Sequence, residues 1–165
     1  MKQGGLTLIE MMIVVLLIGL LALLATPLAS GWIDSARFGE AKGALEQAVG
    51  HAKAAALRNE AGMQTTSAAS KICLSDTGLL SVHSATPAAG ATAAEAAKCD
   101  AASADWSIQL PPKVAIKVDG AVWECSCFTN TALLTKESAN CADCGTSLTF
   151  NIKSGSEDES PVTIY

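Results

Sequence analysis

The sequence GGLTLIEMMIVVLLIGLLALLATP, residues 4–27, decides the architecture of this chain. Residues 11–28 carry no charge, and a run of this length is about what a helix needs to cross a bilayer. Glu10 stands at the front of the run, where an acid costs about 2.5–3.5 kcal/mol on insertion scales. Such an acid is expected to have a cationic partner at the same depth. The alternative is that Glu10 lies at the headgroup level and is solvated.

The flanks of the apolar run predict its orientation and processing. Lys2 precedes the run, which predicts that the N-terminus stays in the cytoplasm while the remainder crosses. An ordinary secretory signal begins similarly, but Glu10 fits it badly and no good small-x-small cleavage site follows. Cleavage between Gly5 and Leu6 would instead create an amine four residues before Glu10. The amine of one subunit would then neutralise Glu10 of a neighbour as their helices pack together.

The sequence GLTLIE at residues 5–10, the apolar run and Pro27 together resemble the class III signal of type IV pilins and type II secretion pseudopilins. The resemblance implies that a prepilin peptidase cuts after Gly5 and N-methylates Leu6. It also implies that Glu10 guides docking into a helical filament and that Pro27 kinks the helix. Leu6 departs from the family, which most often has phenylalanine there, and this departure bears on methylation more than on cleavage.

The same resemblance implies a division into a leader peptide at 1–5, a transmembrane and filament-core helix at 6–30, and a periplasmic head at 31–165. The chain would wait in the bacterial inner membrane as a single-pass protein and then pass into a pilus or pseudopilus. Its implied partners are other pilin or pseudopilin subunits, the prepilin peptidase, the inner-membrane assembly platform and, before assembly, membrane lipid.

Beyond the membrane run, the pattern predicts a second helical half. Gly19, Pro27 and Gly31 are expected to interrupt the helix, and Gly62 to cap its C-terminus. In between, small and apolar residues recur at spacings of three or four and form one narrow face. The narrow face consists of Ala41, Leu45, Ala48, Ala52 and Ala55 or Ala56. The whole helix, roughly residues 6–60, would be about 80 Å long.

After Gly62 the apolar period changes to two, which predicts an antiparallel sheet and an α+β fold, with a long N-terminal helix followed by a type IV pilin-like head. A hairpin is expected at 71–82. A low-complexity surface insertion is expected at 84–105, with a helical turn at 93–98. A turn at Asp119-Gly120 is expected to lead into a strand at 121–128. Further strands are expected at 106–110, 114–118, 148–152 and 161–165.

A finer resemblance concerns the head. The helix exit AAALRN at 54–59, the strand WSIQLP at 106–111 and residues 148–155 resemble the GspH/FimT-type minor pilins and pseudopilins. Members of that group prime assembly or lie at a filament tip, and a few bind DNA. The net charge of −5 and the acidic run at 157–159 argue against DNA as a partner, because phosphate binding needs a basic face.

All six cysteines follow the apolar run, and an even count beyond a membrane segment favours disulfides in an oxidising compartment. Six cysteines allow fifteen pairings. One attractive arrangement nests Cys125–Cys144 around Cys127–Cys141, which leaves Cys73 with Cys99. Two alternatives remain: the CxC and CxxC pairs could together hold zinc, or Cys141-x-x-Cys144 could be a redox pair, although no thioredoxin-like pattern accompanies it.

Several functions fit these observations. A structural filament subunit, in particular a minor pilin or a pseudopilin, fits best; a major pilin and a tip-located pilin that binds a surface or DNA are the alternatives. An anchored enzyme would need a nucleophile or metal site. His51 and His83, the two histidines, have no obvious Ser, Cys or Asp arrangement beside them and are expected at the surface. We therefore expect neither enzymatic activity nor a cofactor.

Overall fold

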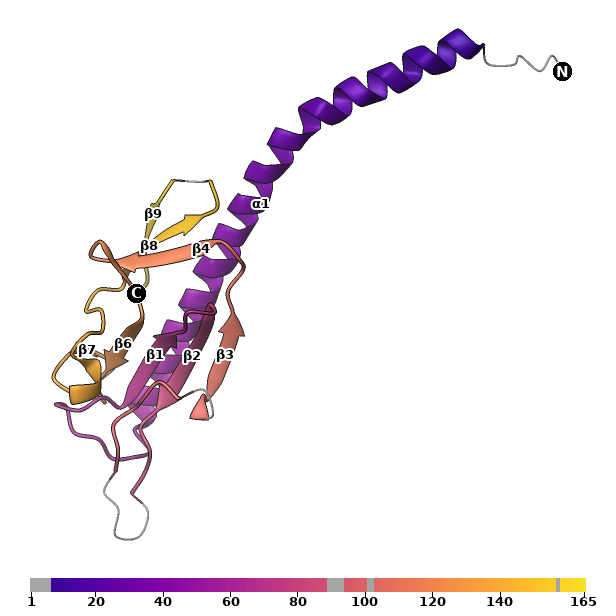
Figure 1. Cartoon of the computed structure of the whole chain (residues 1–165). Coiled ribbons are helices and arrows are strands. Elements are labelled where there is room, and N and C mark those ends of the chain that lie inside the picture. The colour runs from indigo at the N-terminus through magenta and orange to yellow at the C-terminus, as the bar shows by residue number, and fades with distance from the viewer. Residues whose placement is uncertain (1–6, 89–93, 101–102, 157) are drawn as a thin grey trace.

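One long helix and two antiparallel sheets make up the described part of the chain. The computed structural model describes residues 7–88, 94–100, 103–156 and 158–165, with the backbone alone for residues 24–30. Helix α1 (Leu8–Arg58) is a curved rod of 51 residues. Its C-terminal half lies against the strands, while its N-terminal half projects clear of them (Figure 1). The expected α+β class, with a helix followed by antiparallel strands, is confirmed.

Helix α1 is continuous, which corrects the prediction that Gly19, Pro27 and Gly31 interrupt it. Helix propagation is cooperative, so long helix-forming segments on both sides carry the backbone through isolated breakers. The C-terminal cap is also different from the predicted one. Asn59, with φ of 44°, takes the left-handed cap position, and its side chain exchanges hydrogen bonds with the backbone of Met63. Asparagine tolerates this conformation because its short polar side chain bonds locally.

The first sheet lies along the C-terminal half of α1 and has the strand order β3-β2-β1-β6-β7. The predicted hairpin is present, with Ile72 of β1 opposite Val82 of β2, and Ile72 also lies opposite Ser126 of β6. The strands are β1 (Ser70–Leu74), β2 (Leu79–Ser84), β3 (Trp106–Gln109), β6 (Cys125–Phe128) and β7 (Leu134–Thr135).

The second sheet has the order β5-β4-β8-β9. Asp119 and Gly120 both have positive φ, 52° and 82°, as the predicted tight hairpin requires. The expected single strand at 121–128 is instead split: its first two residues pair with β4, and its last four join the other sheet. The strands are β4 (Val114–Val118), β5 (Ala121–Val122), β8 (Thr149–Ser154) and β9 (Ser160–Thr163).

Trp123 explains this split. Its side chain is 2% exposed and packs edge-on against Phe150 of β8, with ring centroids 5.0 Å apart. Its indole N–H donates to Ser126 Oγ at 3.0 Å. The Trp123 side chain therefore points into the core between the sheets before the chain continues as β6. The periodicity of the strand residues does not predict this change.

The main core lies between α1 and the sheets. Every residue of the predicted narrow helix face is buried, and the small side chains let the helix approach the strands closely. Strand residues complete this core. The largest contributors from the strands are Phe128, Phe150, Ile72, Leu80 and Ile152.

The alanine-rich insertion differs from the prediction. Its described residues 94–98 form no helical turn; Glu95 instead makes an isolated bridge with Thr86, and Ala97 is buried. Residues 89–93 and 101–102, which complete the insertion, lie outside the described residues. A disulfide between Cys73 and Cys99 ties the insertion to β1. The covalent tie and the bridge hold this segment in an extended form.

Candidate functional site

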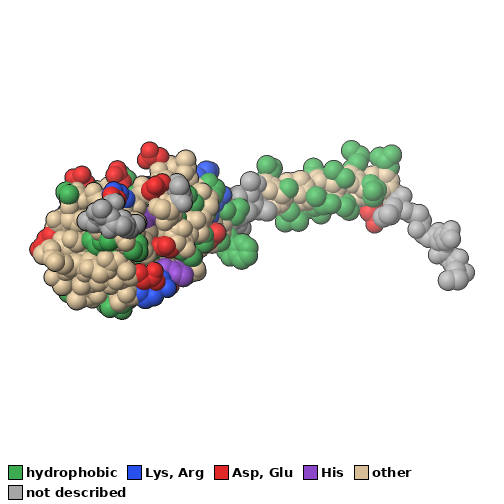
Figure 2. Space-filling model, turned by 90° about the horizontal axis from the view of Figure 1, so that it is seen from below, with side chains coloured by type: hydrophobic (Ala, Val, Ile, Leu, Met, Phe, Trp, Pro, Cys, Tyr) green, Lys and Arg blue, Asp and Glu red, His purple; other side chains and the backbone are tan. Residues whose placement is uncertain are grey.

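The free half of α1 exposes apolar side chains around its whole circumference. Leu8 is 79% exposed, Leu23 is 76% exposed, and large apolar residues between them are also exposed. Figure 2 shows these side chains along the rod beyond the head. A helix that is apolar all round is normally buried by lipid or by other helices. Among the described residues, no helix is both long enough and apolar enough to cross a membrane.

A capping box closes the N-terminus of α1. Thr7 is the N-cap, and its hydroxyl accepts a hydrogen bond from the Glu10 backbone N–H at 3.4 Å. The Glu10 carboxylate in turn accepts from the Thr7 N–H at 3.5 Å. Glu10 is therefore engaged with its own helix end in the single chain. The T-x-x-E spacing at residues 7–10 is the signal that reveals this second role of Glu10.

The structure leaves the processing residues untested. Gly5 and Leu6 lie outside the described residues, and Pro27 is described only by its helical backbone. Cleavage, methylation and the kink at Pro27 therefore stay predictions. Glu10 lies on the exposed first turn of α1, and its docking role also stays a prediction.

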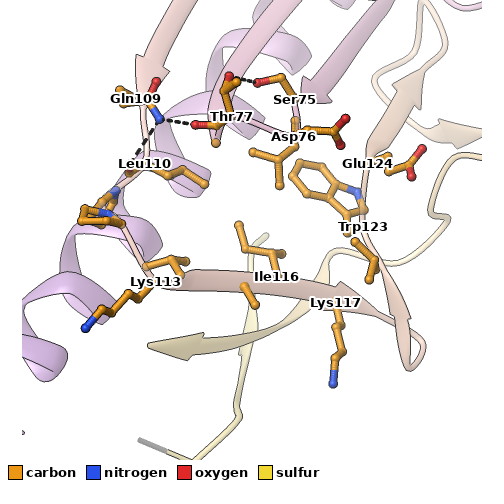
Figure 3. A pocket seen from close by; sticks show the side chains of 17 residues that line it. Ser75, Asp76, Thr77, Gln109, Leu110, Lys113, Ile116, Lys117, Trp123 and Glu124 are labelled. Atoms are coloured by element: carbon orange, nitrogen blue, oxygen red, sulfur yellow. Dashed lines mark hydrogen bonds between the residues drawn. The ribbon is translucent and has the colours of Figure 1, made fainter. Parts of the chain in front are cut away.

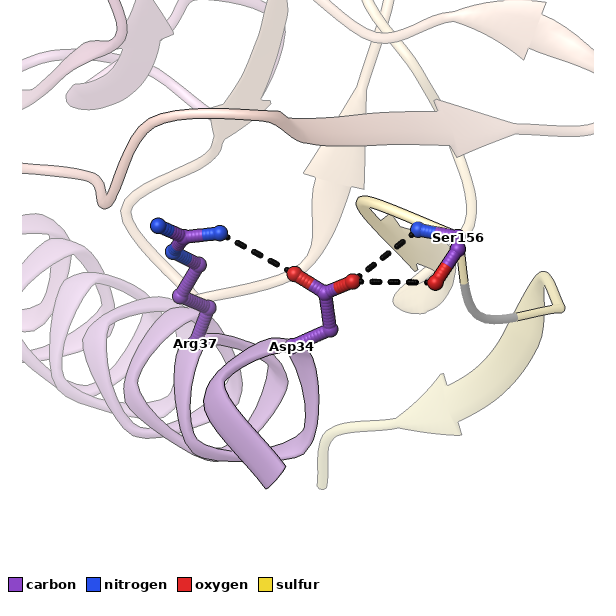
Figure 4. Close-up of polar contacts among 3 residues, drawn as sticks. All are labelled: Asp34, Arg37 and Ser156. Atoms are coloured by element: carbon purple, nitrogen blue, oxygen red, sulfur yellow. Dashed lines mark hydrogen bonds and ion pairs between the residues drawn. The ribbon is translucent and has the colours of Figure 1, made fainter. Parts of the chain in front are cut away.

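A polar latch joins α1 to the second sheet where the helix meets the head (Figure 4). The Asp34 carboxylate accepts hydrogen bonds from the backbone N–H and the hydroxyl of Ser156, both at 3.1 Å, and from Arg37 at 3.0 Å. Gly155 precedes Ser156 with φ of +54°, and a Cβ there would collide with the Asp34 carboxylate. The latch sets the position of the β8–β9 loop on the helix.

The latch makes the stability of the head depend on pH. The hydrogen bond from the Ser156 backbone N–H has the largest effect and lowers the pKa of Asp34 below its ordinary value of 3.8. Burial opposes it, and the Ser156 hydroxyl and Arg37 lower the pKa further. A lowered folded-state pKa stabilises the fold above the unfolded pKa, and this stabilisation is lost as pH falls through the folded pKa. Asp34→Asn should therefore lower the melting temperature at pH 7, with the difference from wild type shrinking below pH of about 3.8.

Ser156→Ala is the matched control for this prediction, because it removes the hydroxyl and keeps the backbone N–H. Thermal unfolding across pH 2 to 7 should show a smaller loss for Ser156→Ala than for Asp34→Asn. Equal melting temperatures of Asp34→Asn and wild type at pH 7 would contradict the latch.

The six cysteines form three disulfides in the arrangement favoured from the sequence: Cys73–Cys99, Cys125–Cys144 and Cys127–Cys141. The last two join β6 to the loop around the 3-10 turn η2 (Ala139–Cys141). Their four sulfurs are buried together in a small core beside Ala68, separate from the main one. These cross-links hold a segment that has little regular secondary structure of its own.

A cleft of about 660 Å³ lies between the two sheets (Figure 3). Several polar groups at its rim form hydrogen bonds with one another. Gln109 Nε2 donates to the Thr77 carbonyl oxygen at 2.8 Å, and the Ser75 and Thr77 hydroxyls form a hydrogen bond at 2.8 Å. The Lys113 and Lys117 side chains extend away from the cleft. Its lining includes the carboxylates of Asp76 and Glu124 as well as these hydroxyl and amide groups.

A second cavity, of about 430 Å³, lies on the face of the first sheet turned away from α1. His83 lines it and is 1% exposed, which corrects the expected surface position. The Ser81 hydroxyl lies 2.9 Å from His83 Nε2, so a serine does stand beside this histidine. Burial lowers the pKa of His83 below its ordinary value and so favours the neutral imidazole. Ser81 lines the same cavity and is 7% exposed.

His51 behaves as expected. It is exposed on α1, where it stacks on Trp106 of β3 with ring centroids 5.1 Å apart. This contact joins the helix to the edge strand of the first sheet.

Comparison with known proteins identifies one segment. Residues 1–26 match the prokaryotic N-terminal methylation motif, a type IV prepilin-like signal. No curated protein and no solved structure matches the chain. The match supports the class of type IV pilins and pseudopilins, and it does not extend to the GspH/FimT subgroup. The chain thus combines the signal of a processed pilin-type or pseudopilin-type subunit with an α+β fold consistent with type IV pilins.

Proposed function

We propose that this chain is a structural subunit, a minor pilin or a pseudopilin, of a type IV pilus or a type II secretion filament. The observation that carries the proposal is the bare apolar half of α1, which lies within the segment that matches the methylation motif. Burying one large aliphatic side chain stabilises by about 1.5–3 kcal/mol, so a rod with many of them gains strongly from an apolar environment. Membrane lipid and neighbouring helices are the two environments that supply it.

In this proposal the prepilin peptidase cuts between Gly5 and Leu6 and methylates the Leu6 amine. Residues 6–30 then hold the subunit in the inner membrane, with the head at 31–165 in the periplasm. The assembly platform passes the subunit into the filament, where α1 exchanges lipid for other helices. Glu10 supports this step, because a neighbour's N-terminal amine would replace the Thr7 N–H as partner of its carboxylate.

The experiment that tests this proposal determines the first residue of the mature chain and whether its amine is methylated. Mass spectrometry and Edman sequencing of the chain from cells that possess the peptidase should find Leu6 first, with one added methyl group on its amine. Gly5→Val should leave a precursor longer by five residues, because a branched side chain beside the cut blocks access to the peptide bond. Gly4→Val, one residue further from the cut, is the matched control and should be processed. A mature chain that starts at another residue would overturn the proposal.

A further inference from the structure

Three buried polar side chains line the cavity of about 430 Å³ on the outer face of the first sheet. Side chains alternate along a strand, and the Ser70 hydroxyl of β1 donates to a carbonyl of α1, so Lys71 faces away from the helix. Lys71 lies directly opposite His83 of β2, and Ser81 is its diagonal neighbour on the same face. His83 is 1% exposed, and Lys71 and Ser81 are each 7% exposed. These three side chains are the floor of the cavity.

Lys71 has unused hydrogen-bonding capacity. Its ammonium group donates to the Asn140 carbonyl at 2.6 Å, which is its one hydrogen bond within the described part of the chain. An ammonium group carries three donors, so two N–H groups are left for another partner. Burial lowers the pKa of Lys71 below its ordinary value of 10.5, and the charge of Asp143 partly offsets this effect. An anionic group bound beside Lys71 would further offset the cost of burying its charge.

The Ser81 hydroxyl can supply a second donor. It lies 2.9 Å from His83 Nε2. Burial favours the neutral imidazole, and a ring with its proton on Nε2 donates to the Ser81 oxygen. The hydroxyl hydrogen is then left with one distant internal acceptor, the Cys73 carbonyl at 3.5 Å. A ligand carboxylate would be a stronger acceptor, because hydrogen bonds to ionised groups are shorter and stronger.

The rim of the cavity has the opposite charge to its floor. Glu124 and Asp143 line the cavity and are exposed. Two rim carboxylates would repel a simple anion, whereas a molecule with one anionic and one cationic end would be attracted at both ends. The cavity volume lies near the lower end of the range for small-molecule sites. Two disulfides form part of its wall, so the site belongs to the oxidised chain; they are Cys73–Cys99 and Cys125–Cys144.

We propose that this cavity binds a small zwitterion of about the size of a dipeptide. Its carboxylate accepts hydrogen bonds from Lys71 and Ser81, and its ammonium group lies between the carboxylates of Glu124 and Asp143. The cavity and α1 lie on opposite faces of the first sheet. Binding therefore requires neither cleavage of the chain nor assembly through α1, and it can be tested apart from the proposed filament role.

The test is calorimetric titration of the full oxidised chain in detergent with dialanine and its capped forms. We expect saturable binding of one dialanine per chain. Converting its carboxylate to an amide should weaken binding by roughly 10–100-fold, because a buried charge-assisted hydrogen bond is lost. Acetylating its amine should weaken binding by about 2–5-fold, because the rim carboxylates are exposed.

Several results of these titrations would overturn the proposal. Absence of dialanine binding would remove the site. Equal binding of acetate or of acetylated dialanine would show a simple anion site rather than a zwitterion site. Equal or tighter binding of free alanine would contradict the dipeptide size.

Variants assign each end of the ligand to its partner. Lys71→Met should bind dialanine and its amide alike, while Lys153→Met, which removes an exposed lysine of β8, should keep the wild-type preference for the free carboxylate. Persistence of that preference in Lys71→Met would overturn the assignment. Near-ultraviolet circular dichroism checks that each variant is folded.

A second variant avoids changes to the buried floor. Glu124→Gln combined with Asp143→Asn alters exposed side chains and should preserve the fold. It should bind dialanine and acetylated dialanine alike, while still preferring the free carboxylate over the amide. A wild-type preference for the free amine in this variant would contradict the role of the rim.

Discussion

Replacing Glu10 with leucine is expected to leave the chain processed and membrane-inserted but to lower its incorporation into filaments by more than about 100-fold. The physical reason is that a neighbour's N-terminal amine would then be buried without its partner, and breaking a buried ion pair costs about 3–5 kcal/mol. The leucine itself suits an apolar helix, so insertion should not suffer. Quantitative immunoblots of sheared filaments and of membranes, from cells that also express the unmodified partners, measure the ratio.

The capping box makes a matched control necessary for this prediction. Thr7→Ala removes the hydroxyl that accepts from the Glu10 N–H but keeps the carboxylate. It should cost about 1 kcal/mol of helix stability and leave incorporation largely intact. Wild-type incorporation of Glu10→Leu would contradict the docking role. An equal defect in Thr7→Ala would assign the effect to the helix cap instead.

Replacing Cys125, Cys127, Cys141 and Cys144 with serine should destabilise the head by about 3 kcal/mol or more. The two disulfides close loops with sequence separations of 19 and 14 residues. Loop entropy gives about 3 kcal/mol for a 15-residue loop, and the nested second loop adds less than this because the first already restricts it. Urea unfolding followed by circular dichroism measures the change.

The control for this prediction replaces Cys73 and Cys99, whose disulfide ties the insertion to β1. That pair should also lower the unfolding free energy, and because Cys73 lies directly opposite Cys125, the effects of the two sets of substitutions should depart from additivity. Unchanged urea midpoints in the four-serine variant would contradict a structural role for the two disulfides that it lacks.

Much of the head could be predicted because its helix face and its hairpin turn depend on residues that are close together in the sequence. The buried face of α1 follows from residues such as Ala41 and Leu45 at helical spacing, and the β4–β5 hairpin follows from Asp119-Gly120. Other features depended on distant contacts. His83 lies between two serines, Ser81 and Ser84, at a strand end in the sequence, yet it is buried on β2, opposite Lys71 of β1.

The features of α1 also fall into two groups, those that the local sequence reveals and those that depend on distant residues. The exposed apolar rod and Glu10 can be recognised from residues 4–27 alone, since the length of the run and the isolated acid are local facts. The latch could not, because Asp34 and Ser156 are 122 residues apart and meet only when β8 packs on α1.

The amino-acid sequence by itself determined the long helix, the positions of its apolar and acidic residues, and the strand-forming segments, because these depend on periodicity and spacing along the chain. Only the tertiary structure decided that the strands divide into two sheets, that Trp123 turns inward, and that Lys71 lies opposite Cys127. These outcomes depend on which surfaces fill the same core, and no residue carries that information without its distant neighbours.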